Sequence, residues 1–125
     1  ERHPPPEVVQ VKTGFGWIEI GGTRYDHDVI IHADTTVSKR KKKASKALKG
    51  EYGHTPLSEA ELDILPDENP AVVYIGTGQY GDLPVTPGAG ALLAGYNGVV
   101  LPTPEILPAV EAERRRFVAI LHVTC

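Results

Sequence analysis

The sequence predicts an α/β domain built on a central mixed β-sheet, with flanking helices and a small N-terminal β element. Two observations predict this class. Up to Val37, short strand-like runs are separated by glycine turns. Beyond residue 70, apolar runs alternate with helix-start signals, which indicates parallel strands joined by crossovers. The length of 125 residues suits a single soluble domain with its own core.

The first part of the chain is predicted to form a tail followed by strands. Residues 1–7 hold three consecutive prolines, which favour an extended, disordered tail before a domain over 8–125. Residues 15–20 are followed by two glycines suited to a tight turn, and residues 23–25 then return as a second strand. Residues 29–32 are predicted as a short buried strand. These strands extend the central sheet or form a small second one.

A basic segment follows, with seven of the chain's thirteen Lys and Arg residues: Lys39, Arg40, Lys41, Lys42, Lys43, Lys46 and Lys49. Gly50 and Gly53 predict that it is a loop. Its first five basic residues form a candidate basic surface that could bind phosphate backbones. Base-stacking aromatic residues are missing from the segment, and the net charge of −3 gives no general attraction for nucleic acid. We therefore expect a solvated loop, with an acidic protein partner as an alternative.

Helix signals come next. Ser58 and Glu61 match a capping box, which predicts a short helix over 58–65 that stops at Pro66. Thr86 and Pro87 provide a second helix start. That helix is expected to run to about Asn97, with Gly98 as a left-handed cap.

The second half also supplies the central strands. Residues 71–75 are apolar throughout, as expected for a strand covered on both faces. Residues 99–101 are predicted as a second buried strand, and 117–123 as the last one. Between these two, Thr103 repeats the helix-start signal, and Pro108 makes that helix short or kinked.

A glycine-rich loop follows the first central strand and formally matches G-x-G-x-x-G: Gly76, Thr77, Gly78, Gln79, Tyr80 and Gly81. A dinucleotide site is not expected, because 82–87 delay the helix start and no acidic residue follows the next strand. The favoured interpretation is that the glycines allow tight backbone packing. The alternative is a looser ligand pocket in which Thr77, Gln79 and Tyr80 supply polar contacts. No cofactor is expected.

Two other clusters hold reactive groups. Asp26, His27 and Asp28 are adjacent, and side-chain alternation would point the histidine away from the carboxylates, so no metal site is expected. His122 and Cys125 would lie on opposite faces of a strand, which favours incidental roles, and no catalytic residue is assigned. A single cysteine and no long apolar stretch predict a reducing, cytoplasmic compartment without a membrane span.

Six segments together carry a family resemblance. They are YDHDVII at 25–31, SKRKK at 38–42, HTPLS at 54–58, VYIGTGQYG at 73–81, LPVTP at 83–87 and LHVTC at 121–125. In this order they resemble the Mth938-domain family, small proteins of bacteria, archaea and animals. The resemblance implies one domain with a central mixed sheet, helices layered on it and a smaller β element.

The same resemblance bears on function. No enzymatic reaction is established for the family, and its animal members include a respiratory complex I assembly factor. It therefore implies a non-enzymatic interaction or assembly module with a protein partner. The alternatives are ligand binding or catalysis at 76–81 and, more weakly, nucleic-acid binding at 39–49. Two departures from the family pattern are Gly88, where relatives tend to have an acidic residue, and a short segment over 103–117.

Overall fold

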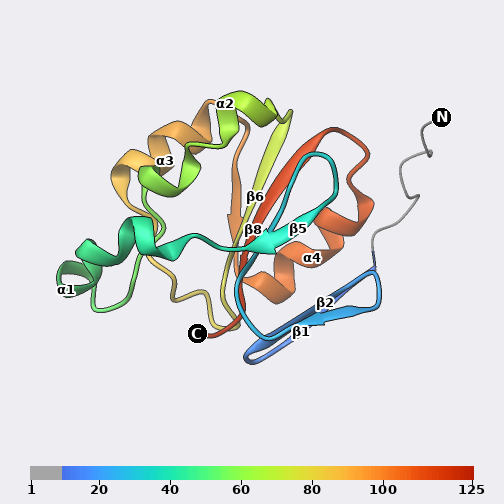
Figure 1. Cartoon of the computed structure of the whole chain (residues 1–125), viewed down its shortest axis with the longest axis horizontal. Coiled ribbons are helices and arrows are strands. Elements are labelled where there is room, and N and C mark those ends of the chain that lie inside the picture. The colour runs from blue at the N-terminus through green and yellow to red at the C-terminus, as the bar shows by residue number, and fades with distance from the viewer. Residues whose placement is uncertain (1–9) are drawn as a thin grey trace.

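The computed structural model describes residues 10–125, and the predicted tail over 1–7 lies outside them. Two β-sheets organise the fold (Figure 1). The larger has the strand order β5-β4-β8-β6-β7. Its strands are β4 Val29–Ile31, β5 Val37–Lys39, β6 Val72–Thr77, β7 Val99–Leu101 and β8 Phe117–His122. The smaller has the order β1-β2-β3, with β1 Val11–Gly14, β2 Trp17–Ile20 and β3 Thr23–Tyr25.

The larger sheet is mixed, as predicted. Strand β6 runs parallel to β7 and to β8, whereas β4 is antiparallel to β8 and to β5. Val29 pairs with Leu121 in the β4–β8 register. The expected parallel crossovers and the small second sheet are therefore confirmed, and the chain has an α/β fold.

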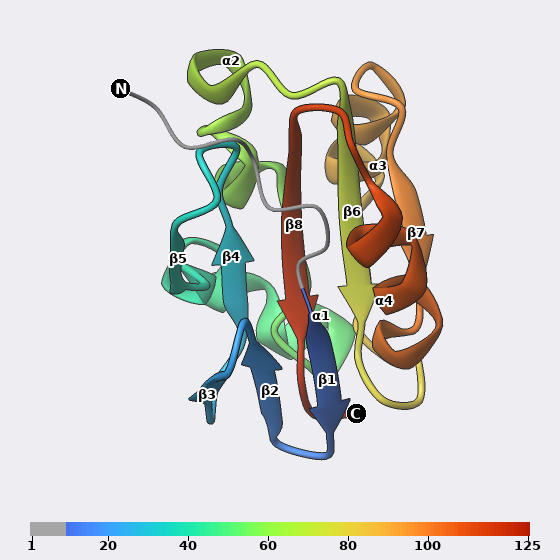
Figure 2. The same cartoon turned by 90° about the vertical axis from the view of Figure 1, so that its right-hand side faces the viewer.

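Both faces of the larger sheet are covered, because alternate residues of its central strands point into two separate cores. On one face, Ala119 and Leu121 of β8 pack with the small sheet and with α4 (Thr103–Ala112). On the other, Val118 and Ile120 pack with α3 (Pro87–Ala94) and the segment around Leu62. Figure 2 shows the small sheet and α4 in front of the larger sheet, with α3 behind it.

The predicted burial is confirmed for β6 and wrong for β7. Every residue of β6 is buried. In β7, Val100 and Leu101 are 43% and 39% exposed. The difference follows from the strand order, because β7 lies at the edge of the sheet and pairs only with β6.

Helix α3 begins as predicted but ends earlier. The hydroxyl of Thr86 accepts a hydrogen bond from the Ala89 N–H at 3.2 Å, which confirms the N-cap. Its C-cap is Gly95, and the left-handed residue is Asn97 rather than Gly98. Gly98 provides space instead, because a Cβ atom there would lie 2.8 Å from that of Leu93.

The basic segment is largely helical, so the predicted loop is wrong. After β5, a 3₁₀ helix, η1, spans Lys42–Leu48 and passes into α1, Lys49–Tyr52. A second 3₁₀ helix, η2, spans Glu59–Leu62, and α2 spans Leu65–Glu68. The capping box is also wrong, because Ser58 makes no side-chain cap. Pro66 does not stop a helix either, since it lies in the first turn of α2, where the missing N–H is tolerated.

Helix α4 contains Pro108, as expected, but Thr103 is its first residue and not its cap. The hydroxyl of Thr103 bonds to the Gly78 N–H and the His122 carbonyl instead. Within residues 10–125, no helix has both the length and the apolar character that crossing a bilayer requires.

Candidate functional site

A pocket of about 180 Å³ opens where β6 and β8 end. The carboxyl ends of parallel strands are a common place for ligand sites in α/β folds. The pocket is lined by Arg40, Lys42, Lys49, His54, Thr55, Asp82, Leu83, His122, Thr124 and Cys125. Polar side chains therefore dominate its wall.

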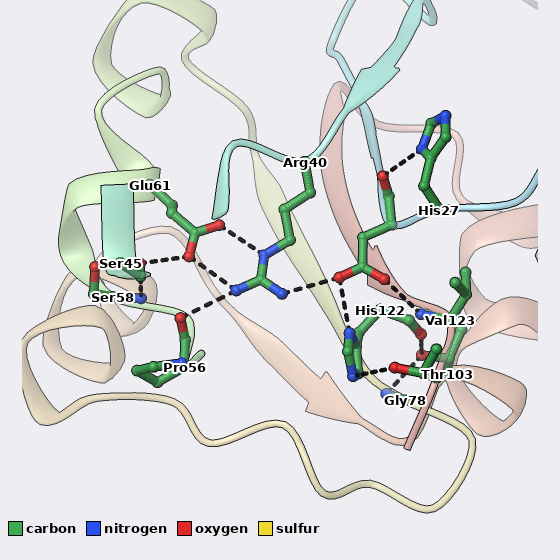
Figure 3. A network of polar contacts seen from close by, with 12 residues as sticks. His27, Arg40, Ser45, Pro56, Ser58, Glu61, Gly78, Thr103, His122 and Val123 are labelled. Atoms are coloured by element: carbon green, nitrogen blue, oxygen red, sulfur yellow. Dashed lines mark hydrogen bonds and ion pairs between the residues drawn. The ribbon is translucent and has the colours of Figure 1, made fainter. Parts of the chain in front are cut away.

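His122 is held between two oxygen atoms. Its Nδ1 lies 2.8 Å from Oδ2 of Asp28, and its Nε2 lies 3.1 Å from Oγ1 of Thr124. The sheet explains the first contact, because the register that pairs Val29 with Leu121 brings the preceding Asp28 next to His122. Figure 3 shows the imidazole within a continuous network of polar contacts.

Asp28 is buried and accepts hydrogen bonds on both oxygens. Oδ1 accepts from the Val123 N–H at 2.9 Å, and Oδ2 accepts from Nη1 of Arg40 at 2.9 Å. Burial by itself raises the pKa of Asp28. The hydrogen bond and charge of His122, followed by the bonds from Val123 and Arg40, outweigh burial and lower the pKa to about 2. Asp28 is therefore a carboxylate that can act only as an acceptor.

Arg40 does not belong to the predicted basic surface, because only 1% of its side chain is exposed. Its Nε donates to Oε1 of Glu61 at 2.7 Å, and its Nη2 donates to Oε2 at 3.0 Å. Nη2 also donates to the Pro56 carbonyl at 3.0 Å. A guanidinium rather than an ammonium group suits this position, since it offers several donors in a fixed plane.

Two buried serines complete the network behind the pocket. Oγ of Ser45 donates to Oε2 of Glu61 at 2.5 Å and lies 2.6 Å from Oγ of Ser58. Figure 3 shows how these contacts connect η1 with the chain around Pro56. The network therefore fixes the helical segment that carries Lys42 and Lys49 to the pocket.

The glycine loop supports the pocket without lining it. A Cβ atom at Gly76 would lie 2.6 Å from Oγ1 of Thr103, and one at Gly78 would lie 2.5 Å from the carbonyl carbon of Cys125. Thr103 Oγ1 accepts from the Gly78 N–H at 2.9 Å and donates to the His122 carbonyl at 2.7 Å. The absence of side chains at these glycines thus lets three chain segments meet, in agreement with the packing interpretation.

The other loop residues point elsewhere. Gln79 Nε2 donates to Oγ1 of Thr13 at 3.0 Å, and Tyr80 is 71% exposed beside Phe15. Thr77 is buried, and Gly81 has a φ of 76°. None of the six predicted loop residues is among those that line the pocket, whereas the following Asp82 and Leu83 are.

The remaining candidates of the basic surface do not all contribute to the pocket. Lys39, Lys41, Lys42 and Lys43 are all exposed, but of these only Lys42 lines the pocket. The expected separation of His122 and Cys125 is wrong, since both line it. The strand ends at His122, and the next residues follow the glycine loop. There the Gln79 N–H donates to the Thr124 carbonyl at 2.7 Å, and the Asp82 N–H donates to the Cys125 carbonyl at 2.9 Å.

At Gly88, where relatives tend to have an acidic residue, the structure places the carboxylate of another residue. The carboxylate of Glu59 fills the space that a side chain at Gly88 would need. Oε1 of Glu59 also accepts a hydrogen bond from the Thr86 hydroxyl at 3.0 Å. A carboxylate thus lies at the start of α3 even though residue 88 has none.

Sequence reasoning missed the contacts of Asp28 and Thr124 with His122, and the place of His54 on the pocket wall. Asp28 and His122 are 94 residues apart, and the cue that could have joined them is the pairing of the predicted strands over 29–32 and 117–123. Asp26, two residues earlier, does not line the pocket and pairs with Arg24 at 2.9 Å. Among residues 10–125, no cluster of three His, Cys, Asp or Glu side chains is arranged to hold a metal ion.

Comparison with known proteins places the chain in a family. No family model and no curated protein matches it. The crystal structure of PH1505 from Pyrococcus horikoshii is 31% identical over 93% of this chain and 99% of that one, with a TM-score of 0.80. The structure of MT938 is 30% identical over 91% and 96%, with a TM-score of 0.57. The chain belongs to the Mth938 family.

Other Mth938-like structures support the fold. The solution NMR structure of a Mth938-like domain from Bordetella pertussis is 22% identical over 98% of this chain and 90% of that one, with a TM-score of 0.56. PH1505 is a conserved hypothetical protein. The biochemical function of the chain is therefore unknown, and functional inference rests on its own site.

Proposed function

We propose that this member of the Mth938 family binds a small anionic ligand in the pocket where β6 and β8 end. The observation that carries the proposal is the set of charges on the wall. Lys42, Lys49 and His54 are exposed there, and Asp82 is the single acidic residue among the lining side chains. Arg40 adds little to this excess, because Asp28 and Glu61 already pair with it.

The inner wall offers hydrogen bonds to such a ligand. Thr55 and Thr124, which carry hydroxyls, and His122, which carries an imidazole, also line the pocket. Carboxylate and phosphate groups form strong hydrogen bonds with charged donors. In this proposal the loop over 76–81 holds the walls together, and direct ligand contacts from Thr77, Gln79 and Tyr80 are not needed. We further propose a cytoplasmic setting, in which the Cys125 thiol at the pocket stays reduced.

The test is titration with inorganic phosphate, pyrophosphate and citrate, followed by ¹H–¹⁵N NMR and thermal unfolding at constant ionic strength. We expect one of these anions to shift the backbone signals of His122 and Thr124. A ligand at about 100 times its Kd should add about 2.7 kcal/mol to the free energy of unfolding. The Lys42→Ala and Lys49→Ala variants should each weaken binding.

Lys43→Ala is the matched control, since Lys43 is an exposed neighbour of Lys42 that does not line the pocket. Equal losses in Lys42→Ala and Lys43→Ala would indicate a general charge effect and would contradict a built site. Shifts confined to residues remote from His122 would also contradict it.

A second candidate function, a protein-interaction or assembly module, is favoured by a different observation. Phe15 is 59% exposed and Tyr80 is 71% exposed, and their ring centroids lie 6.1 Å apart. Paired exposed aromatic rings are typical of the centres of protein interfaces. We propose that a partner protein covers both rings with an apolar side chain.

The two functions predict different mutant phenotypes. The double substitution Phe15→Ser and Tyr80→Ser should abolish capture of the protein partner and leave the phosphate titration unchanged. Lys42→Ala should do the reverse. A partner that binds the double variant as well as the native protein would rule out the aromatic surface.

A further inference from the structure

We propose that the pocket is also an active site, in which His122 deprotonates the hydroxyl of Thr124 for attack on the acyl carbon of a small ester. This inference rests on the proposed function, since the basic wall would hold an anionic part of the same substrate. Its foundation is the chain of contacts from Asp28 through His122 to Thr124. The substrate class is a carboxylic ester that carries a carboxylate or phosphate group.

The hydrogen bonds around Asp28 determine which nitrogen of His122 carries the proton. Asp28 accepts from the Val123 N–H and from Arg40 Nη1, as a carboxylate does. The neutral imidazole must therefore donate from Nδ1 to Oδ2, which lies 2.8 Å away. Nε2 is then the acceptor, and the donor that it faces is Oγ1 of Thr124 at 3.1 Å.

This arrangement matches the requirement for an activated hydroxyl. A nucleophile and a base lie within hydrogen-bond reach, and a third group orients the base. Asp28 is buried, which limits the competition of water for Nδ1, whereas His122 and Thr124 both line the pocket. The imidazole of His122 is thus oriented by a buried carboxylate and is accessible from the pocket. Asp28 acts here as a positioning residue.

The reaction proceeds in two balanced halves. His122 Nε2 takes the proton of Thr124 as Oγ1 forms a bond to the acyl carbon, and the carbonyl electron pair moves onto its oxygen. That pair returns as the bond to the alkoxide leaving group breaks, and the alkoxide receives the proton from Nε2. Water, deprotonated by the same nitrogen, then attacks the acyl-threonine. The carboxylic acid leaves and the hydroxyl of Thr124 is restored.

The basic rim adds a substrate preference to this chemistry. Lys42 and Lys49 line the same pocket as Thr124, and each carries a charge that no residue among 10–125 neutralises in a direct ion pair. An ester with an anionic group could place that group at the lysines and its acyl carbon near Oγ1. The pocket volume of about 180 Å³ is sufficient for a small ester.

The experiment uses diisopropyl fluorophosphate, which reacts with an activated hydroxyl when an O–P bond forms and a P–F bond breaks. Intact-mass spectrometry of the full chain counts the adducts, and peptide mapping locates them. We expect a single adduct on Thr124. Thr124→Ser should keep the reaction, and Thr124→Val, which has the same shape, should abolish it. His122→Asn should slow labelling by about 10²- to 10⁴-fold.

Two results would overturn the inference. One is an adduct whose rate is unchanged in His122→Asn, and the other is the absence of an adduct on Thr124 in the native protein. Fragment sequencing of the C-terminal peptide separates an adduct on Thr124 from one on the neighbouring Cys125. Lys43→Ala is the control, since Lys43 does not line the pocket, and its labelling should equal that of the native protein. If His122→Asn does not fold, as judged by thermal unfolding, the native adduct map and the Thr124→Val and Thr124→Ser pair decide the matter.

Inorganic phosphate separates this inference from the anion-binding proposal. If both hold, phosphate slows the labelling of Thr124 in the native protein and has a weaker effect in Lys42→Ala. Labelling that phosphate does not affect would support the nucleophile and contradict the anion site. Phosphate shifts in NMR without any Thr124 adduct would support the anion site and overturn the nucleophile.

Discussion

Arg40 and Glu61 form a two-point ion pair inside the fold, with Nε 2.7 Å from Oε1 and Nη2 3.0 Å from Oε2. Asp28 takes a third donor of the same guanidinium at 2.9 Å. One buried cation therefore contacts two buried carboxylates, and the Asp28 oxygen that it binds, Oδ2, also lies 2.8 Å from His122 Nδ1. The charged lysines on either side of Arg40 stay exposed, so a run of like charges divides into one internal residue and several surface residues.

Replacement of Arg40 by Met should destabilise the protein strongly. The change leaves Asp28 and Glu61 buried without their cation, and loss of one partner of a buried pair costs about 3–5 kcal/mol. Urea unfolding measures the difference. Lys41→Ala is the neighbouring control and should change the free energy of unfolding by less than about 0.5 kcal/mol. Similar stabilities for the two variants would show that the Arg40 network contributes little.

Acid should destabilise the native protein through Asp28. Its pKa is about 2 in the fold and 3.8 as a free side chain, so the folded state favours the ionised form. The resulting stability is present above about pH 4 and is lost as the pH falls toward about 2. The difference corresponds to about 2 kcal/mol.

The Asp28→Asn variant isolates this contribution. The pKa of Glu113 is also lowered to about 2, chiefly by its hydrogen bond with Arg115, and its effect is common to both proteins. Urea unfolding between about pH 6 and about pH 2 should show a shallower decline for the variant. Parallel curves for the two proteins would contradict the role given to Asp28.

The sequence predicts the sheet better than the segments that surround it. Residues 72–75 and 117–121 are apolar and buried, since both faces of β6 and β8 are covered, and a continuous apolar run indicates that burial directly. Strand β7 has the same apolar composition, yet it lies at an edge. Strand order is a tertiary property, so the exposure of Val100 could not be read from its neighbours in sequence.

The candidate site was harder to predict, because its contacts join distant segments. The motif Ser58–Glu61 matches a capping box, but tertiary contacts with Ser45 and Arg40 engage both side chains. The spacing of His122 and Cys125 indicates opposite faces only while the strand continues, and β8 ends at His122. Local rules were overridden in both places by contacts that form only in the folded chain.

Substitution of Gly78 by Ala should destabilise the protein, whereas the same change at Gly50 should not. Gly78 has a φ of 102°, and a Cβ atom there would lie 2.5 Å from the Cys125 carbonyl carbon. Backbone strain and overpacking together should cost about 2–4 kcal/mol. Gly50 lies in α1 with no atom within 4 Å of an added Cβ, so its replacement should be neutral or stabilise by up to about 1 kcal/mol. Thermal unfolding distinguishes the two, and equal midpoints would contradict the close approach at Gly78.

The hydroxyl of Thr103 should matter for both stability and the pocket. It accepts from the Gly78 N–H and donates to the His122 carbonyl, so it connects the ends of β6 and β8 at the start of α4. Thr103→Val keeps the shape and leaves the buried Gly78 N–H without an acceptor, which should cost about 1–3 kcal/mol.

The Thr103→Ser variant retains the hydroxyl and therefore serves as the control. Urea unfolding should place it much closer to the native protein than Thr103→Val. Because the His122 carbonyl accepts a hydrogen bond from this hydroxyl, Thr103→Val should also lower the affinity for phosphate, even though Thr103 does not line the pocket. If Thr103→Val were destabilised while its phosphate affinity stayed unchanged, the two hydrogen bonds of Thr103 would support the fold without positioning His122. If Thr103→Val and Thr103→Ser had equal free energies of unfolding, the two hydrogen bonds would have no measurable role. The packing of α4 alone would then hold these strand ends together.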